Sequence, residues 1–193
     1  MSSVVISGDT SGAITVSAPA VSGTNTLTLQ AATATSAVNT LGTAVTTTSG
    51  TSIDFTSLPS WIKRITVMMS GVSTNGSSVV MIQLGTSGGV QATSYVGSVW
   101  NSNTANAALS TGFQTLQAAG ATVTIESTAI LTLLNSATGL WSASINTGRS
   151  DAATMAVTAG SKTLSGTLDR VRITTVNGTD TFDAGTINIL YEG

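Results

Sequence analysis

Eight carboxylate side chains could carry out acid–base chemistry or bind a cation in this sequence: Asp9, Asp54, Glu126, Asp151, Asp169, Asp180, Asp183 and Glu192. A glycoside hydrolase needs two carboxyl groups that face each other across a cleft. Glu126 lies in the strand-like stretch VTIEST, and its pairing with Asp151 or Asp169 would meet this need. The spacing does not by itself bring these groups together. We therefore predict no catalytic residue and keep a hydrolase that uses Glu126 as an alternative.

A second group of acids, Asp180 and Asp183 in NGTDTFD, offers the oxygen ligands that hard cations prefer. The segment lacks EF-hand spacing, and Asp next to Gly is typical of turns. The chain contains no cysteine and no histidine, which removes thiolate nucleophiles, Cys/His zinc sites and the usual imidazole base. We expect no metal site, no cofactor and no enzymatic activity.

The basic residues do not form a pattern typical of nucleic-acid binding: Lys63, Arg64, Arg149, Lys162, Arg170 and Arg172. A nucleic-acid-binding domain usually has a basic stripe and a high pI, whereas this chain has a pI of about 4.7. Arg170 and Arg172 alternate with Val171 and Ile173, so both should lie on one solvated face of a strand. AGSKT (159–163) resembles the end of a phosphate loop but lacks the earlier glycine, and we predict a turn there.

Trp61, Trp100 and Trp141 could form a platform on which sugars stack, or they could be large core side chains. Aromatic residues make up only 4% of the chain, so few other bulky side chains are available to fill a core. This favours the core interpretation, in which each indole N–H needs a hydrogen-bond partner. A carbohydrate-binding module, which would require exposed tryptophans, remains an alternative.

Residues 51–193 have the pattern of a compact domain of short antiparallel strands. Strand-like segments at 62–72 and 78–84 flank Asn75-Gly76, a pair typical of a two-residue type I′ hairpin. Further strand-like segments are TSYVGSVW, ATVTIESTAILTLL paired with GLWSASIN, DAATMAVTAGSKTLSG, and LDRVRITTV and TINILY on either side of Asn177-Gly178. About eight strands with regular turn signals predict an all-β fold, an antiparallel jelly-roll-like β-sandwich.

Residues 1–50 differ from the rest, because they contain no basic residue and a single acid. In AITVSA, Ile14 and Val16 share one face of a short strand, and in TLTLQA, Leu27 and Leu29 do the same. An isolated hairpin is marginally stable in water and needs a neighbour. We predict an extended N-terminal β arm for docking and oligomerisation, with these four side chains as its contacts. A flexible Ser/Thr-rich linker is the alternative for the segment that follows them.

The composition favours a protein that associates with copies of itself. Charged residues are 7% of the chain, against about 25% in an average globular protein. The mean hydropathy is +0.35, yet the apolar runs are far shorter than the ~20 residues of a membrane-spanning helix. The N-terminal MSSVVISGDTSG has no basic and no hydrophobic region, so we expect neither a membrane segment nor a signal peptide. A neutral surface is poorly protected against association, as suits a symmetric assembly.

Three segments resemble parts of tailed-bacteriophage virion proteins. GAITVSAPAVSGTNTLTLQAATAT resembles a short repeat near the N-termini of phage fibre and head-surface proteins. IDFTSLPSWIKRITVMMSGVSTNGSS and LSGTLDRVRITTVNGTDTFDAGTINILYE resemble the start and end of a β-sandwich domain of phage virion proteins. Together they cover under half of the chain. The resemblance implies a non-enzymatic virion component, often a homotrimer, and assigns no receptor.

We therefore expect a structural protein of a phage virion that is assembled in the host cytoplasm. A trimeric capsid decoration or cement protein is favoured, which stabilises the head because it binds only the assembled shell. Its partners would be copies of itself and the major capsid protein or other virion proteins, with no nucleic acid and no membrane. A short tail fibre or fibre tip that contacts the host, with NSNTANAALSTG (101–112) as a contact loop, is the alternative.

Overall fold

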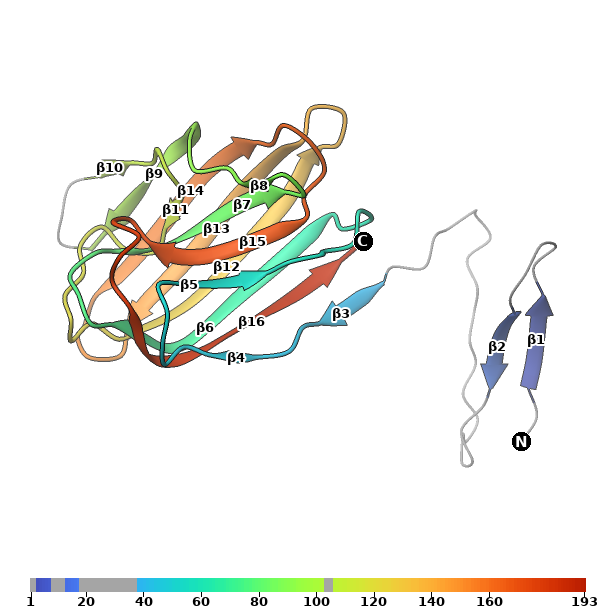
Figure 1. The fold of residues 1–193 in the computed structure, drawn as a ribbon, viewed down its shortest axis with the longest axis horizontal. Helices are drawn as coiled ribbons and strands as arrows, with labels where there is room; N and C mark the ends of the chain where they lie inside the picture. The colour runs from blue at the N-terminus through green and yellow to red at the C-terminus, as the bar shows by residue number, and fades with distance from the viewer. Residues whose placement is uncertain (1–2, 8–12, 18–37, 103–105) are drawn as a thin grey trace. The chain divides into compact units, whose positions relative to one another are not determined.

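The computed structural model describes residues 3–7, 13–17, 38–102 and 106–193. Within these residues the secondary structure consists of strands and turns without a helix, so no helix there could cross a membrane. The chain divides into two units, residues 1–36 and residues 37–193. The first contains a pair of strands and the second contains a two-layered β-sandwich (Figure 1).

The first unit contains β1 (Ser3–Ser7) and β2 (Ala13–Ser17), which pair antiparallel. In their register Ile6 lies opposite Ile14, and Val4 lies opposite Val16. The strand predicted in AITVSA is therefore confirmed as β2. Leu27 and Leu29 lie outside the described residues.

The second unit consists of two antiparallel sheets (Figure 1). The nine-stranded sheet has the order β10 (Ala107–Ala108), β9 (Tyr95–Asn101), β14 (Met155–Thr163), β13 (Leu140–Arg149), β12 (Ile125–Asn135), β6 (Arg64–Thr74), β16 (Phe182–Glu192) and β3 (Asn39–Leu41), with β4 (Val45–Thr46) also paired to β16. The five-stranded sheet has the order β11 (Phe113–Gln114), β7 (Val80–Thr86), β15 (Arg170–Thr175) and β5 (Ser52–Phe55), with β8 (Gly89–Val90) paired to β7. The predicted antiparallel β-sandwich is confirmed, and its jelly-roll connectivity remains a prediction.

Alternation along the strands places the core between the two sheets. In β6 the side chains of Ile65, Val67 and Met69 are buried, and the residues between them lie on the outer face. The largest fully buried side chains come from both sheets: Phe113, Phe182, Ile65, Ile82, Leu84, Leu116, Ile125, Leu131, Ile145, Ile173, Ile187 and Ile189. Packing these aliphatic and aromatic side chains together supplies the main stabilisation of the sandwich.

A hydrogen bond through the core joins the two sheets. Tyr95 on β9 is buried, and its hydroxyl oxygen accepts the amide N–H of Leu84 on β7 at 2.7 Å. Its ring meets that of Phe113 edge-on, with the ring centroids 4.8 Å apart. Burial raises the pKa of the Tyr95 hydroxyl to about 12, because the charged form would lose its hydration.

The hairpins predicted at the two Asn-Gly pairs are wrong. β6 and β7 flank Asn75-Gly76 and belong to different sheets, as do β15 and β16 on either side of Asn177-Gly178. Both segments therefore cross from one sheet to the other. A type I′ turn needs positive φ at both central residues, and of these four residues only Gly178 has it, at 70°. The Asn-Gly signal identifies a change of direction but not the sheet that receives the next strand.

Among the other predicted elements, one strand pairing is confirmed, one turn is wrong and one boundary differs. β12 and β13 pair antiparallel around residues 135–139, as predicted. The turn predicted at 159–163 is wrong, because these residues form the second half of β14 between β13 and β9. The predicted arm, residues 1–50, includes β3 and β4, both of which pair with β16 of the sandwich. The structure thus divides the chain after residue 36, whereas the sequence prediction divides it after residue 50.

Candidate interaction sites

Two of the four predicted arm contacts lie in a described strand. Ile14 and Val16 occupy alternate positions of β2, opposite Ile6 and Val4 of β1 in the strand register. Leu27 and Leu29 are outside the described residues. The docking role of all four side chains remains a prediction.

The three tryptophans have different environments. Trp141 on β13 is only 2% exposed and joins the core, as predicted. The core prediction is wrong for Trp61 and Trp100, which are 37% and 43% exposed. Trp61 packs against the ring of Tyr191 with the centroids 5.8 Å apart, and Trp100 lies on β9.

An apolar strip lies on the outer face of the larger sheet. It consists of the exposed side chains of Val96 and Trp100 on β9 and of Met155 and Val157 on β14. Trp100 is directly opposite Val157 in the strand register. The sequence contains a signal for this strip, since TSYVGSVW and MAVTA carry apolar residues at both odd and even positions. One face of such a strand fills the core, and the other face remains apolar and exposed.

The three carboxylates of the hydrolase alternative have separate structural roles. Glu126 accepts the amide N–H of Gly71 at 2.8 Å, at an irregularity in the pairing of β6 with β12. It lines a groove of about 540 Å³ on the outer face of the larger sheet and is the sole acid among the described residues there. Asp151 pairs with Arg149, and Asp169 pairs with Arg170. The second carboxylate that glycoside hydrolysis requires across the cleft is therefore absent from that lining.

Asp180 joins the two crossing segments into what we call the inter-sheet clamp, residues 75–78 and 175–181. Its carboxylate accepts the amide N–H of Ser78 at 2.8 Å and the side-chain amide of Asn177 at 2.6 Å. Asn75 is held on the facing segment by two hydrogen bonds to the main chain of Thr181, each 2.9 Å long. The bond from Asn177, followed by that from Ser78, lowers the pKa of Asp180.

The inter-sheet clamp explains the acids that suggested a cation site. Asp180 is occupied by donors from the protein, and Asp183 accepts a hydrogen bond from the Ser73 hydroxyl. Among the described residues, no cluster of three or more Asp, Glu, His or Cys side chains is arranged to hold a metal ion. A Cβ at Gly76 would lie 2.0 Å from Oδ2 of Asp180, so a larger residue there would displace the carboxylate from its donors.

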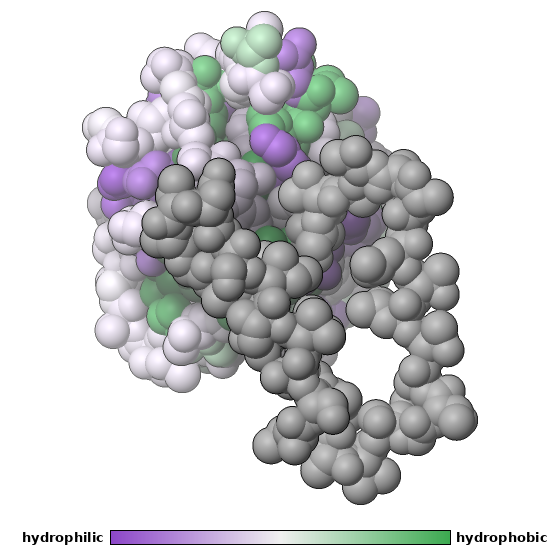
Figure 2. All heavy atoms as spheres, turned by 90° about the vertical axis from the view of Figure 1, so that its right-hand side faces the viewer, coloured by the Kyte–Doolittle hydropathy of each residue, from purple (hydrophilic) through white to green (hydrophobic). Residues whose placement is uncertain are grey.

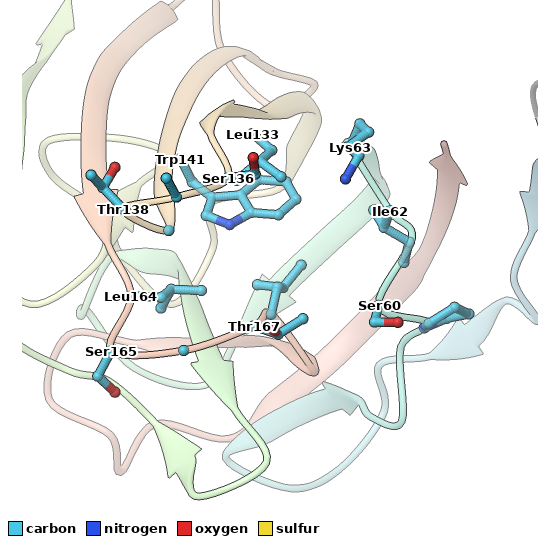
Figure 3. Close-up of a pocket in the computed structure, with 15 residues that line it drawn as sticks. Ser60, Ile62, Lys63, Leu133, Ser136, Thr138, Trp141, Leu164, Ser165 and Thr167 are labelled. Carbon is cyan, nitrogen blue, oxygen red and sulfur yellow. The ribbon is translucent and has the colours of Figure 1, made fainter.

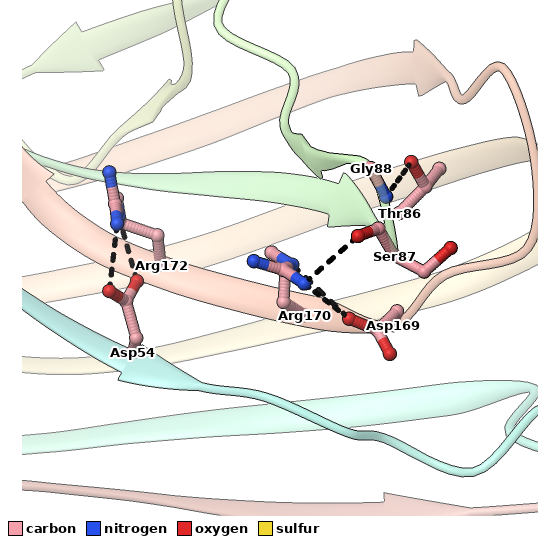
Figure 4. A network of polar contacts seen from close by, with 7 residues as sticks. All are labelled: Asp54, Thr86, Ser87, Gly88, Asp169, Arg170 and Arg172. Carbon is pink, nitrogen blue, oxygen red and sulfur yellow. Dashed lines mark hydrogen bonds and ion pairs between the residues drawn. The ribbon is translucent and has the colours of Figure 1, made fainter.

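Arg170 and Arg172 lie on one face of β15, as predicted, and each is neutralised there (Figure 4). Arg172 makes two parallel hydrogen bonds of 2.7 and 2.8 Å to Asp54 on β5, which raise the pKa of the guanidinium. Arg170 bonds to Asp169 at 2.9 Å and to the Ser87 carbonyl at 3.4 Å. This face therefore presents ion pairs rather than free positive charge.

The remaining basic side chains include one without a partner. Arg64 pairs with Glu192 at 3.3 Å, and Arg149 pairs with Asp151. Lys162 is buried, donates to the Thr93 carbonyl at 2.8 Å, and has a pKa lowered by its burial. Lys63 makes no ion pair and no hydrogen bond through its side chain to any described residue.

Lys63 borders a cavity of about 300 Å³ at the end of the sandwich opposite the inter-sheet clamp. We call it the loop cavity, because residues 59–60, 62–63, 136–139 and 164–168 surround it, with Trp141 and Leu133 beside them (Figure 3). Its lining combines apolar side chains with the hydroxyl groups of Ser60, Ser136, Thr138, Ser165 and Thr167. No acidic side chain is among the described residues that line it. No local sequence pattern predicts this site, because its residues come from three separate loops.

The face in Figure 2 is largely pale over the described residues, with small separate groups of hydrophilic and hydrophobic side chains.

Comparisons of the chain with protein-family models, with curated proteins and with solved structures found no match.

Proposed function

We propose that this protein is a non-enzymatic structural component of a phage virion, a trimeric decoration protein that stabilises the assembled head. The observation that carries the proposal is the apolar strip on an antiparallel sandwich whose other surface is nearly free of unpaired charge. Val96, Trp100, Met155 and Val157 are exposed on neighbouring strands. This arrangement suits a surface that a neighbouring subunit covers.

The energetics of association support covering the strip. Complete burial of a Val or Met side chain stabilises a structure by about 1.5–3 kcal/mol relative to leaving it exposed. The four exposed apolar side chains on this face of β9 and β14 thus offer a contact that repays part of the entropy lost on association. With a net charge of −2, the subunits repel one another only weakly.

The N-terminal strand pair supplies a second kind of contact in this proposal. An isolated two-stranded pair is marginally stable in water, and β1 and β2 form such a pair. Docking through Ile14 and Val16, together with Leu27 and Leu29, would give these strands the neighbour that they need. Because the arm would bind the assembled shell and not its unassembled subunits, it would stabilise the shell by mass action.

A short tail fibre or fibre tip is the second candidate, and the loop cavity favours it. A protein that only covers a shell needs no open cavity at a loop end, whereas a protein that contacts the host uses such loops for recognition. The apolar strip is compatible with a trimer in either position on the virion. The two candidates therefore differ in where the protein attaches.

Gold-labelled antibodies on intact phage particles that carry the protein test the proposal. Serum raised against the purified chain should label the head over its whole surface, and serum absorbed with the same protein should not. Label confined to the tail would contradict the decoration role and favour the fibre. Particles without label would contradict a virion location altogether.

Sedimentation equilibrium tests the trimer separately. We expect a mass of three 19.2-kDa chains for the wild type and a lower mass for Val96→Ser combined with Trp100→Ser. Leu134→Ser is the matched control, because Leu134 is as exposed as Val96, at 67%, but lies on β12 outside the strip. A monomeric wild type, or a variant mass equal to that of the wild type, would contradict the role of the strip.

A further inference from the structure

The indole N–H of Trp141 is an accessible donor on a largely buried side chain, and it has no partner among the described residues. Its side chain is 2% exposed, yet the indole nitrogen makes no hydrogen bond to any described residue. No buried side-chain nitrogen or oxygen among the described residues lacks a partner. The indole nitrogen must therefore be open to a space that a solvent or ligand atom can reach, and the loop cavity, which Trp141 lines, is that space (Figure 3). A buried tryptophan usually finds a partner for this group.

A free positive charge lies beside the same cavity. Lys63 is the one basic residue of the chain whose side chain has neither a carboxylate nor a carbonyl partner among the described residues. Figure 3 shows its side chain extending toward the space that the Trp141 nitrogen faces. The nearest acid along the sheet, Glu192, is paired with Arg64. The charge of Lys63 is thus available to a ligand.

The loops around the cavity are held in place by main-chain hydrogen bonds. Leu164 donates to the Gly139 carbonyl at 3.0 Å, and Leu133 donates to the Lys63 carbonyl at 2.8 Å. Asn135 accepts the amide groups of Ala137 and Thr138 at 2.9 and 3.2 Å, which fixes the turn between β12 and β13. The cavity is therefore preformed, and a ligand would lose little binding energy to ordering it.

The lining restricts the chemistry of the ligand. Trp141 and Lys63 are donors, and the surrounding hydroxyl groups can donate or accept. The absence of an acid from the lining leaves the charge of Lys63 uncompensated. Apolar side chains from Ile62, Leu133 and Leu164 cover part of the wall. The complementary molecule is anionic, rich in acceptor oxygens, and partly apolar.

We propose that the loop cavity binds a carboxylate-bearing monosaccharide, with the carboxylate at Lys63 and ring oxygens at the Trp141 N–H. A cavity of about 300 Å³ lies at the lower end of the range for small-molecule sites, as suits one sugar unit rather than an oligosaccharide. The CH groups of a sugar ring would contact the apolar wall. This proposal holds whether the protein attaches to a head, to a tail or to neither.

Titration of the ¹⁵N-labelled full chain, followed by NMR of its three indole N–H signals, tests the proposal. The probes are sodium D-glucuronate, neutral D-glucose and sodium acetate at equal concentrations. Trp61→Phe and Trp100→Phe, both at exposed sites, identify the Trp141 signal by elimination. Glucuronate should shift the Trp141 signal with a saturable curve of millimolar Kd, and glucose and acetate should bind at least ~10-fold more weakly.

Variants then test the assigned contact. Lys63→Met keeps the length of the side chain but removes its charge, and should weaken glucuronate binding by ~10-fold without changing the weak response to glucose. Arg149→Met is the matched control, because it removes one positive charge at the other end of β13 from Trp141 and should leave binding unchanged. Three results would overturn the proposal: no saturable shift of the Trp141 signal, an equal response to acetate or glucose, or equal weakening by both variants.

Discussion

The segments that flank β6 at its two ends both contain small polar residues, but the polar side chains at the two ends differ in their hydrogen-bond partners. At one end, directly after β6, the donors and acceptors of the inter-sheet clamp bond to one another around Asp180. At the other end, directly before β6, the side chains of Lys63 and Trp141 have no polar partner in the described part of the chain. A strand of 11 residues separates the two ends by about 35 Å.

This difference shows that the partner of a polar side chain decides its role. Asp180 and Asp183 have the residue types of a cation site, but protein donors occupy them. Trp141 has the residue type of a core anchor and is buried as one, but its N–H stays accessible and has no partner among the described residues. We therefore expect the clamp end to contribute to stability and the cavity end to contribute to binding.

The largest expected effect breaks the clamp. Gly76→Ala would place a Cβ 2.0 Å from Oδ2 of Asp180, and should lower the free energy of unfolding by about 3 kcal/mol. Gly148→Ala on β13 is the control, since a Cβ there meets nothing within 4 Å, and should be neutral. Urea unfolding followed by tryptophan fluorescence measures both. Equal stabilities of the two variants would mean that the clamp does not hold the crossing segments.

The next effect concerns a link between the sheets that lies in the core rather than at an end. Tyr95→Phe removes the acceptor of the Leu84 amide, and leaving that buried N–H unpaired should cost about 1.5 kcal/mol. Tyr191→Phe is the control, because its hydroxyl has no hydrogen bond to a described residue. If Tyr95→Phe destabilised the protein more than Gly76→Ala, the clamp would not be the main link between the sheets.

The pH dependence of the clamp gives a smaller but more specific effect. The pKa of Asp180 is lower in the folded chain than its ordinary value of 3.8, because Asn177 and Ser78 donate to its charged form. Its contribution to stability is therefore complete above the unfolded-state pKa and is lost as the pH falls through the folded-state pKa. Asp180→Asn should be less stable than the wild type at pH 7, and the difference should shrink below a pH of about 4. A difference that stays constant with pH, in urea unfolding, would contradict this role of the charge.

The smallest effect is expected at the cavity end. Ser136 and Thr138 are exposed, and their hydroxyl groups make no hydrogen bond to a described residue. The double variant Ser136→Ala and Thr138→Ala should change the free energy of unfolding by less than about 0.5 kcal/mol. A loss as large as that of Gly76→Ala, in the same urea experiment, would show that both ends serve stability.

The sequence predicted those parts of the fold that local alternation determines. The pairing of β12 with β13 follows from two alternating segments on either side of the short turn at residues 136–139. The assignment of β7 and β15 to a separate sheet could not be predicted, because Asn75-Gly76 and Asn177-Gly178 carry the same local signal as a hairpin. Which sheet a strand joins depends on how its buried face fits the whole core.

The sites were less predictable than the strands, because they join residues that are far apart in the chain. Asp180 bonds to Ser78 across 102 positions, so no local motif reveals the pair. The loop cavity joins Lys63, Trp141 and Thr167 in the same way. The apolar strip had a local signal, since β9 and β14 carry apolar residues on both faces.

Hydrogen exchange of the full chain, measured by NMR, tests most directly whether one end of the sandwich is closed and the other open. The amide protons of Ser78 and Thr181 are donated to Asp180 and Asn75, and we predict that they exchange slowly. The indole proton of Trp141 should exchange much faster, although the residue is only 2% exposed. A Trp141 proton as protected as those of Ser78 and Thr181 would contradict the account, because its donor would then have a partner or be closed off from solvent.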